Sequence, residues 1–351
     1  MEDIDKSDLE ELKHRVKDKL AQTELYSYKG TVSKLLGLTV EVKLPGLKIG
    51  DLCYIETYDG KLKPAEVQAF KGEVAQLSLL LDGSGIGQGS LVTSTRRPIT
   101  VPVGDFLLGR LIDPLGNPID GKPLDTTNAL WRPIEGPPPG PFERPIITEQ
   151  FSTGVRAIDG CMTMGCGQRP LIRQKALLTA TAVCEYFRDQ GKKVFLMTDT
   201  VTRCAMAGRE VGLSLGEPPT MKGYPPSIFS WLQKVLERAG NSPKGSITAL
   251  YTVLMEGDDI SDPIVDIVRG IVDGHIFLSR KVAESNHYPA IDVLGSISRL
   301  MSAIASPEHK AAAGKLRTIL SMYRENKDLI DVGMYQPGSN PKLDIAIQMM
   351  P

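Results

Sequence analysis

An acidic residue follows directly after an apolar stretch in the middle of the chain. Residues 193–198 are Lys, Val, Phe, Leu, Met and Thr, which is typical of a β-strand, and Asp199 comes next. In an open α/β sheet, ligands gather outside the carboxyl ends of the parallel strands. A carboxylate at that edge suits a divalent cation such as Mg²⁺. The pattern therefore predicts a metal-positioning role for Asp199, with the cap of a turn or helix as the alternative.

A second group of chemically useful side chains lies in residues 288–299. This stretch combines an aromatic residue, Tyr288, with a proline, an acid, two serines and an arginine, Arg299. The guanidinium of Arg299 is a planar, permanently charged fork that matches the oxygens of a phosphate group. We therefore expect phosphate chemistry here. The alternatives are an interface salt bridge for Arg299 and a core position for Tyr288.

The segments around these residues alternate between helical and extended patterns. Residues 176–188 are rich in Ala and Leu and predict a helix that Gly191 ends. Residues 247–254 and 275–278 are short apolar runs and predict two more buried strands. Residues 307–350 are mostly helical in pattern. This alternation is typical of a parallel α/β layer followed by helices.

The first part of the chain has a different pattern. From residue 28 to about residue 95, short alternating segments are separated by Gly and Pro, which predicts a small β-barrel. The Gly-rich residues 83–89 are not followed by a helical pattern, so we interpret them as a barrel turn and not as a dinucleotide loop. Residues 131–141 contain many prolines and predict a hinge or linker without a helix.

The N-terminal segment predicts a helix with one apolar stripe. Residues 7–10 read Ser-Asp-Leu-Glu, a capping box at which the helix is expected to begin. Leu9, Leu12, Val16 and Leu20 then recur at three- and four-residue steps among charged residues. The stripe either packs on its own chain or docks on a helix of another protein.

Composition excludes several classes of protein. Lys and Arg number 41 against 42 Asp and Glu in 351 residues, and a net charge of −1 argues against a globally basic nucleic-acid binder. The five cysteines lack the paired spacing of a zinc site or a secreted disulfide framework, which favours a reducing cytosol. The acidic start and the absence of an apolar run near ~20 residues predict neither a signal peptide nor a membrane span.

Residues 289–298 resemble the signature of the α/β subunits of rotary ATP synthases. Further stretches narrow this resemblance to the flagellar and type III secretion export ATPases: residues 101–104, 107–110, 153–159, 216–219, 222–227 and 252–259. The resemblance implies an amphipathic N-terminal helix (1–25), a β-barrel (26–98), a Pro/Gly-rich connection (99–150), a RecA-like parallel α/β nucleotide domain (151–306) and a C-terminal helical segment (307–351).

The resemblance also implies an activity and partners. In such ATPases a hexameric ring binds ATP and Mg²⁺ between subunits, and hydrolysis strips chaperones from export substrates and unfolds them. The implied partners are other ring subunits, a stator-like regulator at the N-terminal helix, the export apparatus and chaperone–substrate complexes, with no nucleic acid. The implied location is cytoplasmic, peripheral at the inner face of the cytoplasmic membrane.

Four residues of this sequence match functional positions of that family. Asp199 resembles the acid that positions Mg²⁺ through water, and Arg299 resembles the arginine finger that reaches into the neighbouring subunit. Tyr288 matches the aromatic residue that stacks on adenine, and Tyr335 is a weaker candidate for the same pocket, with a core position as its alternative.

One element of the family pattern is missing. After Arg169 the family has a strand and the phosphate-binding loop Gly-x-x-x-x-Gly-Lys-Ser/Thr, whereas here residues 170–176 resemble a segment that lies well downstream. An internal deletion of about 60 residues is implied, since a βαβ unit takes ~30 residues. The lost part includes the catalytic glutamate. The closest substitute, residues 116–123, has Pro118 and Pro123 where an amide and a hydroxyl are needed, so it predicts a turn.

Two hypotheses follow for the chain as a whole. The first is an export ATPase that has lost its own hydrolysis because the central strands of its nucleotide domain are missing. The second is a non-catalytic ring or regulatory subunit that lends Arg299 and its leading helix to intact partners. Under both, we expect a sound barrel and a nucleotide domain with incompletely covered apolar surface.

Overall fold

The structure is a computed structural model, and it describes residues 29–161, 164–165, 174–255 and 261–349. The chain divides into two compact units. The first contains the described residues up to Ile99 together with Ser214–Gly216, and the second contains Thr100–Leu213 and the described residues from Glu217 onward. The predicted N-terminal helix lies outside the described residues.

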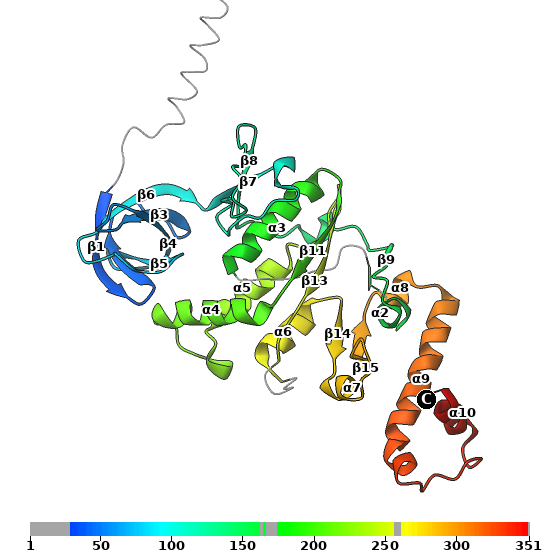
Figure 1. Cartoon of the computed structure of the whole chain (residues 1–351). Coiled ribbons are helices and arrows are strands. Elements are labelled where there is room, and N and C mark those ends of the chain that lie inside the picture. The colour runs from blue at the N-terminus through cyan, green and yellow to red at the C-terminus, as the bar shows by residue number, and fades with distance from the viewer. Residues whose placement is uncertain (1–28, 162–163, 166–173, 256–260, 350–351) are drawn as a thin grey trace, which may run out of the picture. The chain divides into compact units, whose positions relative to one another are not determined.

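The first unit is a closed antiparallel barrel with the strand order β1-β2-β5-β4-β3-β6 (Figure 1). Its strands are β1 (Lys29–Leu36), β2 (Thr39–Lys43), β3 (Asp51–Glu56), β4 (Leu62–Lys71), β5 (Val74–Leu79) and β6 (Leu91–Pro98). Alternate residues point inward, and Val42, Ile55 and Leu77 have no exposed surface. The predicted barrel is confirmed. The Gly-rich residues 83–89 connect β5 to β6 as turns, as expected.

The second unit is built around a small sheet with the order β11-β13-β12. The strands β11 (Lys193–Thr198) and β13 (Ser246–Tyr251) are parallel, and β12 (Gly240–Asn241) pairs antiparallel to β13. Helix α3 (Gln174–Asp189) packs on this sheet, with Cys184 in one apolar cluster with Leu196 and Ile247. Gly191 follows α3 at a φ of 81°, the left-handed conformation expected after a helix end.

Three further helices belong to this sheet region: α4 (Val201–Ser214), α5 (Pro226–Leu236) and α6 (Pro263–Ile271). Helix α4 directly follows the loop after β11, and Figure 1 shows α4, α5 and α6 grouped near the β11–β13 strands. Asp262 caps α6 by accepting a hydrogen bond from the backbone amide of Ile264 at 2.9 Å. A parallel α/β layer is thus formed around a sheet that has three strands among the described residues.

Strand β14 (Gly274–Leu278) does not join the parallel sheet. It pairs antiparallel with β15 (Ile291–Ser298), across the short helix α7 (Arg280–Glu284), and most of its residues are only half-buried. The prediction of a fully buried strand at 275–278 was wrong in this respect. A short apolar run predicts an extended segment but carries no information about which strand pairs with it.

The outer strand β11 has an exposed apolar side. Leu196 is buried, whereas Phe195 is 42% and Met197 64% exposed. Phe151 of the short strand β9 (Gln150–Phe151) stacks on Phe195 with ring centroids 4.8 Å apart. The sequence leads us to expect such incompletely covered apolar surface in this domain.

From Thr100 onward, the Pro/Gly-rich stretch 99–150 is a packed part of the second unit and not a free hinge. It contains β7 (Thr100–Val103), the turn η1 (Asp105–Leu107), β8 (Leu130–Pro133) and the turn η2 (Pro141–Glu143). Strands β7 and β8 pair antiparallel, and Val101 and Ile134 are almost fully buried. Residues 131–141, for which a hinge or linker without a helix is expected, contain no α-helix, because proline removes backbone donors.

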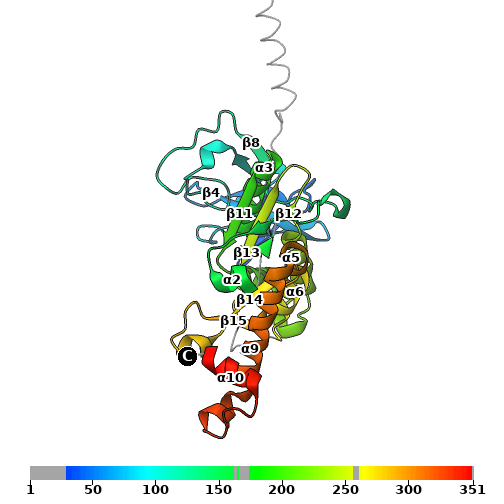
Figure 2. The same cartoon turned by 90° about the vertical axis from the view of Figure 1, so that its right-hand side faces the viewer.

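Residues 307–349 are mostly helical, as predicted: they contain α9 (Pro307–Asp331) and α10 (Pro341–Met349), and α10 packs against α9 (Figure 2). The short helix α8 (Met301–Ile304) precedes them and was not predicted. Two small elements come before residue 166: α2 (Arg156–Cys161) and β10 (Met164–Gly165), which pairs with β9. None of the helices in the described ranges is long and apolar enough to span a membrane.

Two buried cysteines lead to a testable pH dependence of stability. Burial raises the pKa of the Cys53 thiol to about 11 and that of Cys184 to about 12. Because these folded values lie above the ~8.5 of an unfolded thiol, their stabilising contribution is complete below that pH and declines as the pH rises toward 11. We expect the Tm to fall between pH 8 and pH 10.5, and to fall less in a Cys53→Ala/Cys184→Ala variant. Equal slopes for the two proteins would contradict this assignment.

Candidate functional site

Asp199 lies at the carboxyl end of β11, where the sequence places it. It is exposed, and α4 begins two residues later. The ends of β11 and β13 are tied together, because Thr198 Oγ1 donates to the carbonyl of Leu250 at 3.3 Å and Thr252 Oγ1 donates to the carbonyl of Thr198 at 3.2 Å. The carboxylate of Asp199 is thus carried on a fixed strand end that faces solvent.

A cation at Asp199 would find few other ligands in the described parts of the chain. The next residue, Thr200, is 2% exposed, and its hydroxyl has no hydrogen-bond partner among the described residues. No group of three or more His, Cys, Asp and Glu side chains that could hold a metal occurs in the described parts of the chain. A single exposed carboxylate suits contact with Mg²⁺ through the ion's own waters better than a dedicated metal cage.

Arg299 directly follows β15, and its guanidinium is held by backbone carbonyls. It donates to the carbonyl of Arg269 at 3.1 Å and to that of Gly270 at 3.4 Å, both in the last turn of α6. A cation at this end of a helix is favoured by the helix dipole. The Arg299 side chain remains exposed, so it can reach a group outside its own chain.

The two tyrosines differ in how much freedom their side chains have. Tyr288 is 69% exposed, in the loop between α7 and β15. The hydroxyl of Tyr335 donates to Asp344 at 2.9 Å and lies 3.1 Å from the carbonyl of Asn340, which ties the loop before α10 to that helix. Tyr335 therefore has a structural role in the C-terminal segment, while the ring of Tyr288 is available to stack on a partner group.

The structure does not combine these residues into one cluster. Asp199 follows the β11-β13-β12 sheet, Tyr288 and Arg299 flank β15 of a different sheet, and Tyr335 lies between α9 and α10. In the described part of the chain, no hydrogen bond or ion pair joins any of these four side chains to another. Within one chain, these four side chains therefore lie on separate surfaces and do not form one binding site.

The loop at residues 116–123 is a turn, as predicted. Ile112 and Pro118 form an isolated bridge, and Arg110 forms a bidentate pair with Asp120 through nitrogen–oxygen distances of 2.6 and 2.9 Å. Asp113 accepts from the backbone amide of Asn117 at 2.8 Å. Two carboxylates thus occupy the positions around this loop, and no helix follows it before residue 141. The described residues do not fit a triphosphate cradle here.

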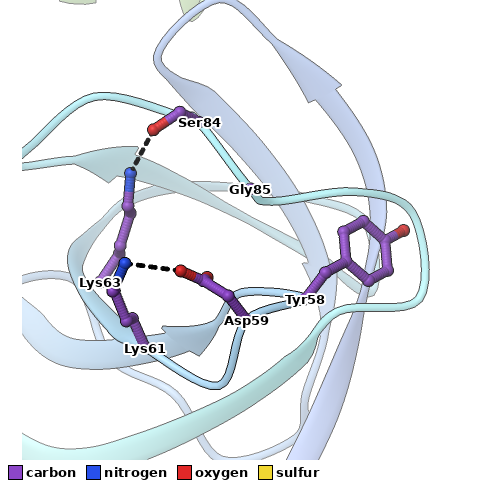
Figure 3. Close-up of a pocket in the computed structure, with 6 residues that line it drawn as sticks. All are labelled: Tyr58, Asp59, Lys61, Lys63, Ser84 and Gly85. Atoms are coloured by element: carbon purple, nitrogen blue, oxygen red, sulfur yellow. Dashed lines mark hydrogen bonds and ion pairs between the residues drawn. The ribbon is translucent and has the colours of Figure 1, made fainter.

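A pocket on the barrel is also unsuited to an anion. It measures about 310 Å³ and is lined by Tyr58, Asp59, Lys61, Lys63, Ser84 and Gly85 (Figure 3). Lys61 pairs with Asp59 at 2.6 Å, and Lys63 pairs with Asp82 at 2.8 Å and donates to Ser84 at 2.9 Å. The Lys61 ammonium, with Thr57, lowers the pKa of Asp59 to about 2. Each lysine thus has a carboxylate of its own.

Sequence reasoning missed two sets of ionic contacts in the second unit. The buried guanidinium of Arg238 forms a bidentate pair with Glu185 at 3.0 and 2.8 Å. The exposed Arg324 of α9 forms a second bidentate pair with Asp292 of β15 at 2.9 and 3.3 Å. These partners are 53 and 32 positions apart, so no local spacing pattern could have found them.

Family comparisons match two parts of the chain. Residues 169–298 match the nucleotide-binding domain of the ATP synthase alpha/beta family, and residues 305–351 match the T3SS EscN ATPase C-terminal domain. The solved structure of the assembled ATPase EscN from the enteropathogenic E. coli type III secretion system is 37% identical, with a TM-score of 0.85 over 91% of this chain and 92% of that one. This chain therefore has the architecture of the ATPases of the ATP synthase alpha/beta type, with a barrel, a nucleotide-binding α/β domain and C-terminal helices.

Two curated relatives narrow the class. The flagellum-specific ATP synthase of Bacillus subtilis is 40% identical over 403 residues, covering 95% of this chain and 91% of the relative. The type 3 secretion system ATPase of Xanthomonas euvesicatoria is 39% identical over 384 residues, covering 91% of this chain and 87% of the relative. The chain belongs to the family of flagellar and type III secretion export ATPases.

Proposed function

We propose that this chain is an export ATPase subunit that does not hydrolyse ATP by itself. The observation that carries the proposal is that its 351 residues contain no Gly-x-x-x-x-Gly-Lys-Ser/Thr sequence, while the closest match, residues 116–123, folds as a turn beside two carboxylates. Without loop amides and a loop lysine, little offsets the cost of removing the triphosphate from water.

The alignments support an internal deletion as the reason. The alignment to the Bacillus subtilis relative extends over 403 residues and that to the Xanthomonas relative over 384, both more than the 351 residues of this chain. Relatives therefore carry positions that have no counterpart here. The junction that the sequence predicts, between Arg169 and Pro170, lies outside the described residues.

A second candidate function is a non-catalytic ring subunit that completes a neighbour's site. The guanidinium of Arg299 is exposed and held by carbonyl oxygens, so no carboxylate of the described residues has to be displaced before it binds a phosphoryl group. In this function Arg299 is the arginine finger, Tyr288 borders the adenine and Asp199 holds Mg²⁺ through water, while Tyr335 is the weakest member of the set.

The partners of the proposed subunit follow from the same family. EscN has been solved as an assembled ATPase and in complex with its central stalk EscO. By analogy we propose a homo- or hetero-hexameric ring, with a stator-like regulator at the N-terminal helix, at the cytoplasmic face of an export apparatus that receives chaperone–substrate complexes.

Two measurements test these functions. The pure chain with ATP and Mg²⁺ is expected to release no phosphate above background, because it lacks the loop that grips the nucleotide. Steady Mg²⁺-dependent turnover by the pure chain contradicts the first proposal. Mixing the chain with the Bacillus subtilis relative then separates the candidates: a ring subunit co-elutes with the relative and changes its turnover, and a merely inactive copy does neither.

A further inference from the structure

Strand β15 contains a large bulge, residues 293–296, shortly before Arg299. In its pairing with β14, His275 faces Ile297 and Phe277 faces Asp292, so residues 293–296 face only one residue of β14. The extra residues fold around Asp292, whose Oδ1 accepts from the backbone amides of Leu294 and Gly295, both at 3.1 Å. A bulge of this kind changes the direction of the strand beyond it.

The bulge is tightly built around the carboxylate. Ser296 Oγ donates to the carbonyl of Asp292 at 2.6 Å and accepts from the amide of Phe277 at 2.9 Å. A Cβ atom at Gly295 would lie only 3.2 Å from Asp292 Oδ2, so a side chain there would press on the carboxylate. The conformation of residues 293–296 therefore depends on where the carboxylate of Asp292 is held.

Helix α9 holds that carboxylate. Arg324 Nη2 donates to Asp292 Oδ2 at 2.9 Å and Nη1 to Oδ1 at 3.3 Å. Partial burial alone would raise the pKa of Asp292, but Arg324 and the two bulge amides lower it below its ordinary value, so the carboxylate is charged at neutral pH. A second arginine of α9, Arg317, donates to the carbonyls of Ser296 at 2.9 Å and Cys161 at 3.2 Å.

The path from the bulge to the finger is short and fixed at its far end. Ile297 and Ser298 complete β15, and the amide of Arg299 donates to the carbonyl of Asp273 at 2.8 Å. The Arg299 guanidinium then rests on the end of α6. The direction of the Arg299 side chain is therefore fixed on one side by the bulge in β15 and on the other by its contacts with α6.

We propose that Arg324, acting through Asp292, is a positioning residue for Arg299, so that the orientation of the finger depends on the position of the C-terminal helix α9. This inference rests on the proposed finger function of Arg299. The side chain of Arg324 is 57% exposed, and a pair this exposed contributes little to stability. Loss of the Arg324–Asp292 pair should therefore change the orientation of the Arg299 side chain and leave the fold intact.

The test uses a mixed ring of this full chain and the Bacillus subtilis relative in which the matching finger arginine has been changed to alanine, so that this chain supplies the finger. Arg324→Gln and Asp292→Asn are expected each to lower kcat on the order of tenfold with KM unchanged, since small misplacements of a catalytic group are costly. The Asn variant keeps one oxygen for the bulge amides, and the double variant is expected to lose no more than either single one, because the residues act as a pair.

Three controls make the outcome decisive. Arg324→Lys keeps a charge near Asp292 and is expected to recover part of the lost kcat, whereas Lys327→Gln, on the exposed side of the same helix, is expected to change nothing. If Arg299→Ala lowers kcat and Arg324→Gln does not, the positioning role is wrong and the finger function stands. If Arg299→Ala has no effect, or the unmodified chain does not join the ring, the finger function is wrong and the positioning role with it.

Discussion

Replacing Arg238 with methionine is expected to lower the free energy of unfolding of the second unit by about 3 to 5 kcal/mol. Arg238 is 1% exposed, and its guanidinium forms a bidentate pair with Glu185. It also donates to the carbonyl of Ile134 at 2.6 Å. Its removal leaves a buried carboxylate without a counter-charge and a buried carbonyl without a donor.

Tryptophan fluorescence during urea unfolding measures this change selectively. The two tryptophans of the chain, Trp131 and Trp231, both lie in the second unit, so the barrel does not contribute to the signal. Lys234→Met on the exposed side of α5 is the matched control and is expected to change the free energy of unfolding by less than about 0.5 kcal/mol.

The double variant Glu185→Leu/Arg238→Met separates the charge from the packing. It removes both ions, so most of the stability lost by Arg238→Met is expected to return, apart from about 1 kcal/mol for the unpaired Ile134 carbonyl. A double variant as unstable as the single one would show that packing of the guanidinium, and not the buried charge, dominates at this site.

Replacing Arg299 with alanine has the largest expected effect on activity. In the mixed ring in which only this chain supplies the finger, kcat is expected to fall on the order of 10³-fold, the usual contribution of an arginine finger. Substrate binding does not depend on the finger to the same degree, so KM should stay within about twofold. Phosphate release by the purified mixed ring is the measurement.

Lysine at position 299 distinguishes charge from geometry. Lys keeps one positive charge but lacks the planar fork, so Arg299→Lys is expected to give an intermediate kcat. Because the Arg299 side chain is exposed, neither variant should shift the unfolding curve of the second unit. Equal turnover of the wild-type and alanine rings would remove Arg299 from the reaction.

Local patterns in the sequence predicted the elements that depend on local physics. Strict alternation gave the barrel, the Ala- and Leu-rich run ending at Gly191 gave α3, and the apolar strand before Asp199 gave β11. The position of Asp199 directly after a strand also follows from this pattern. Each of these features involves residues close together in the chain.

Features that depend on distant residues were not predicted. The pairing of β14 with β15, the buried pair of Arg238 and Glu185, and the pair of Arg324 and Asp292 all join segments whose contact has no periodic signature. The packing of residues 99–150 was missed for the same reason, since proline content reports on backbone donors and not on what the chain lies against.

The exposed side of β11 has a practical consequence for anyone who purifies this protein. Phe195 and Met197 expose apolar surface on β11. Among the described residues, this strand pairs with β13 along one edge, and its other edge is open. Such outer strands are templates on which further strands add, and concentrated stocks should form precipitates sooner than those of the barrel alone. Co-expression with a ring-forming relative is therefore the sensible route to a well-behaved sample.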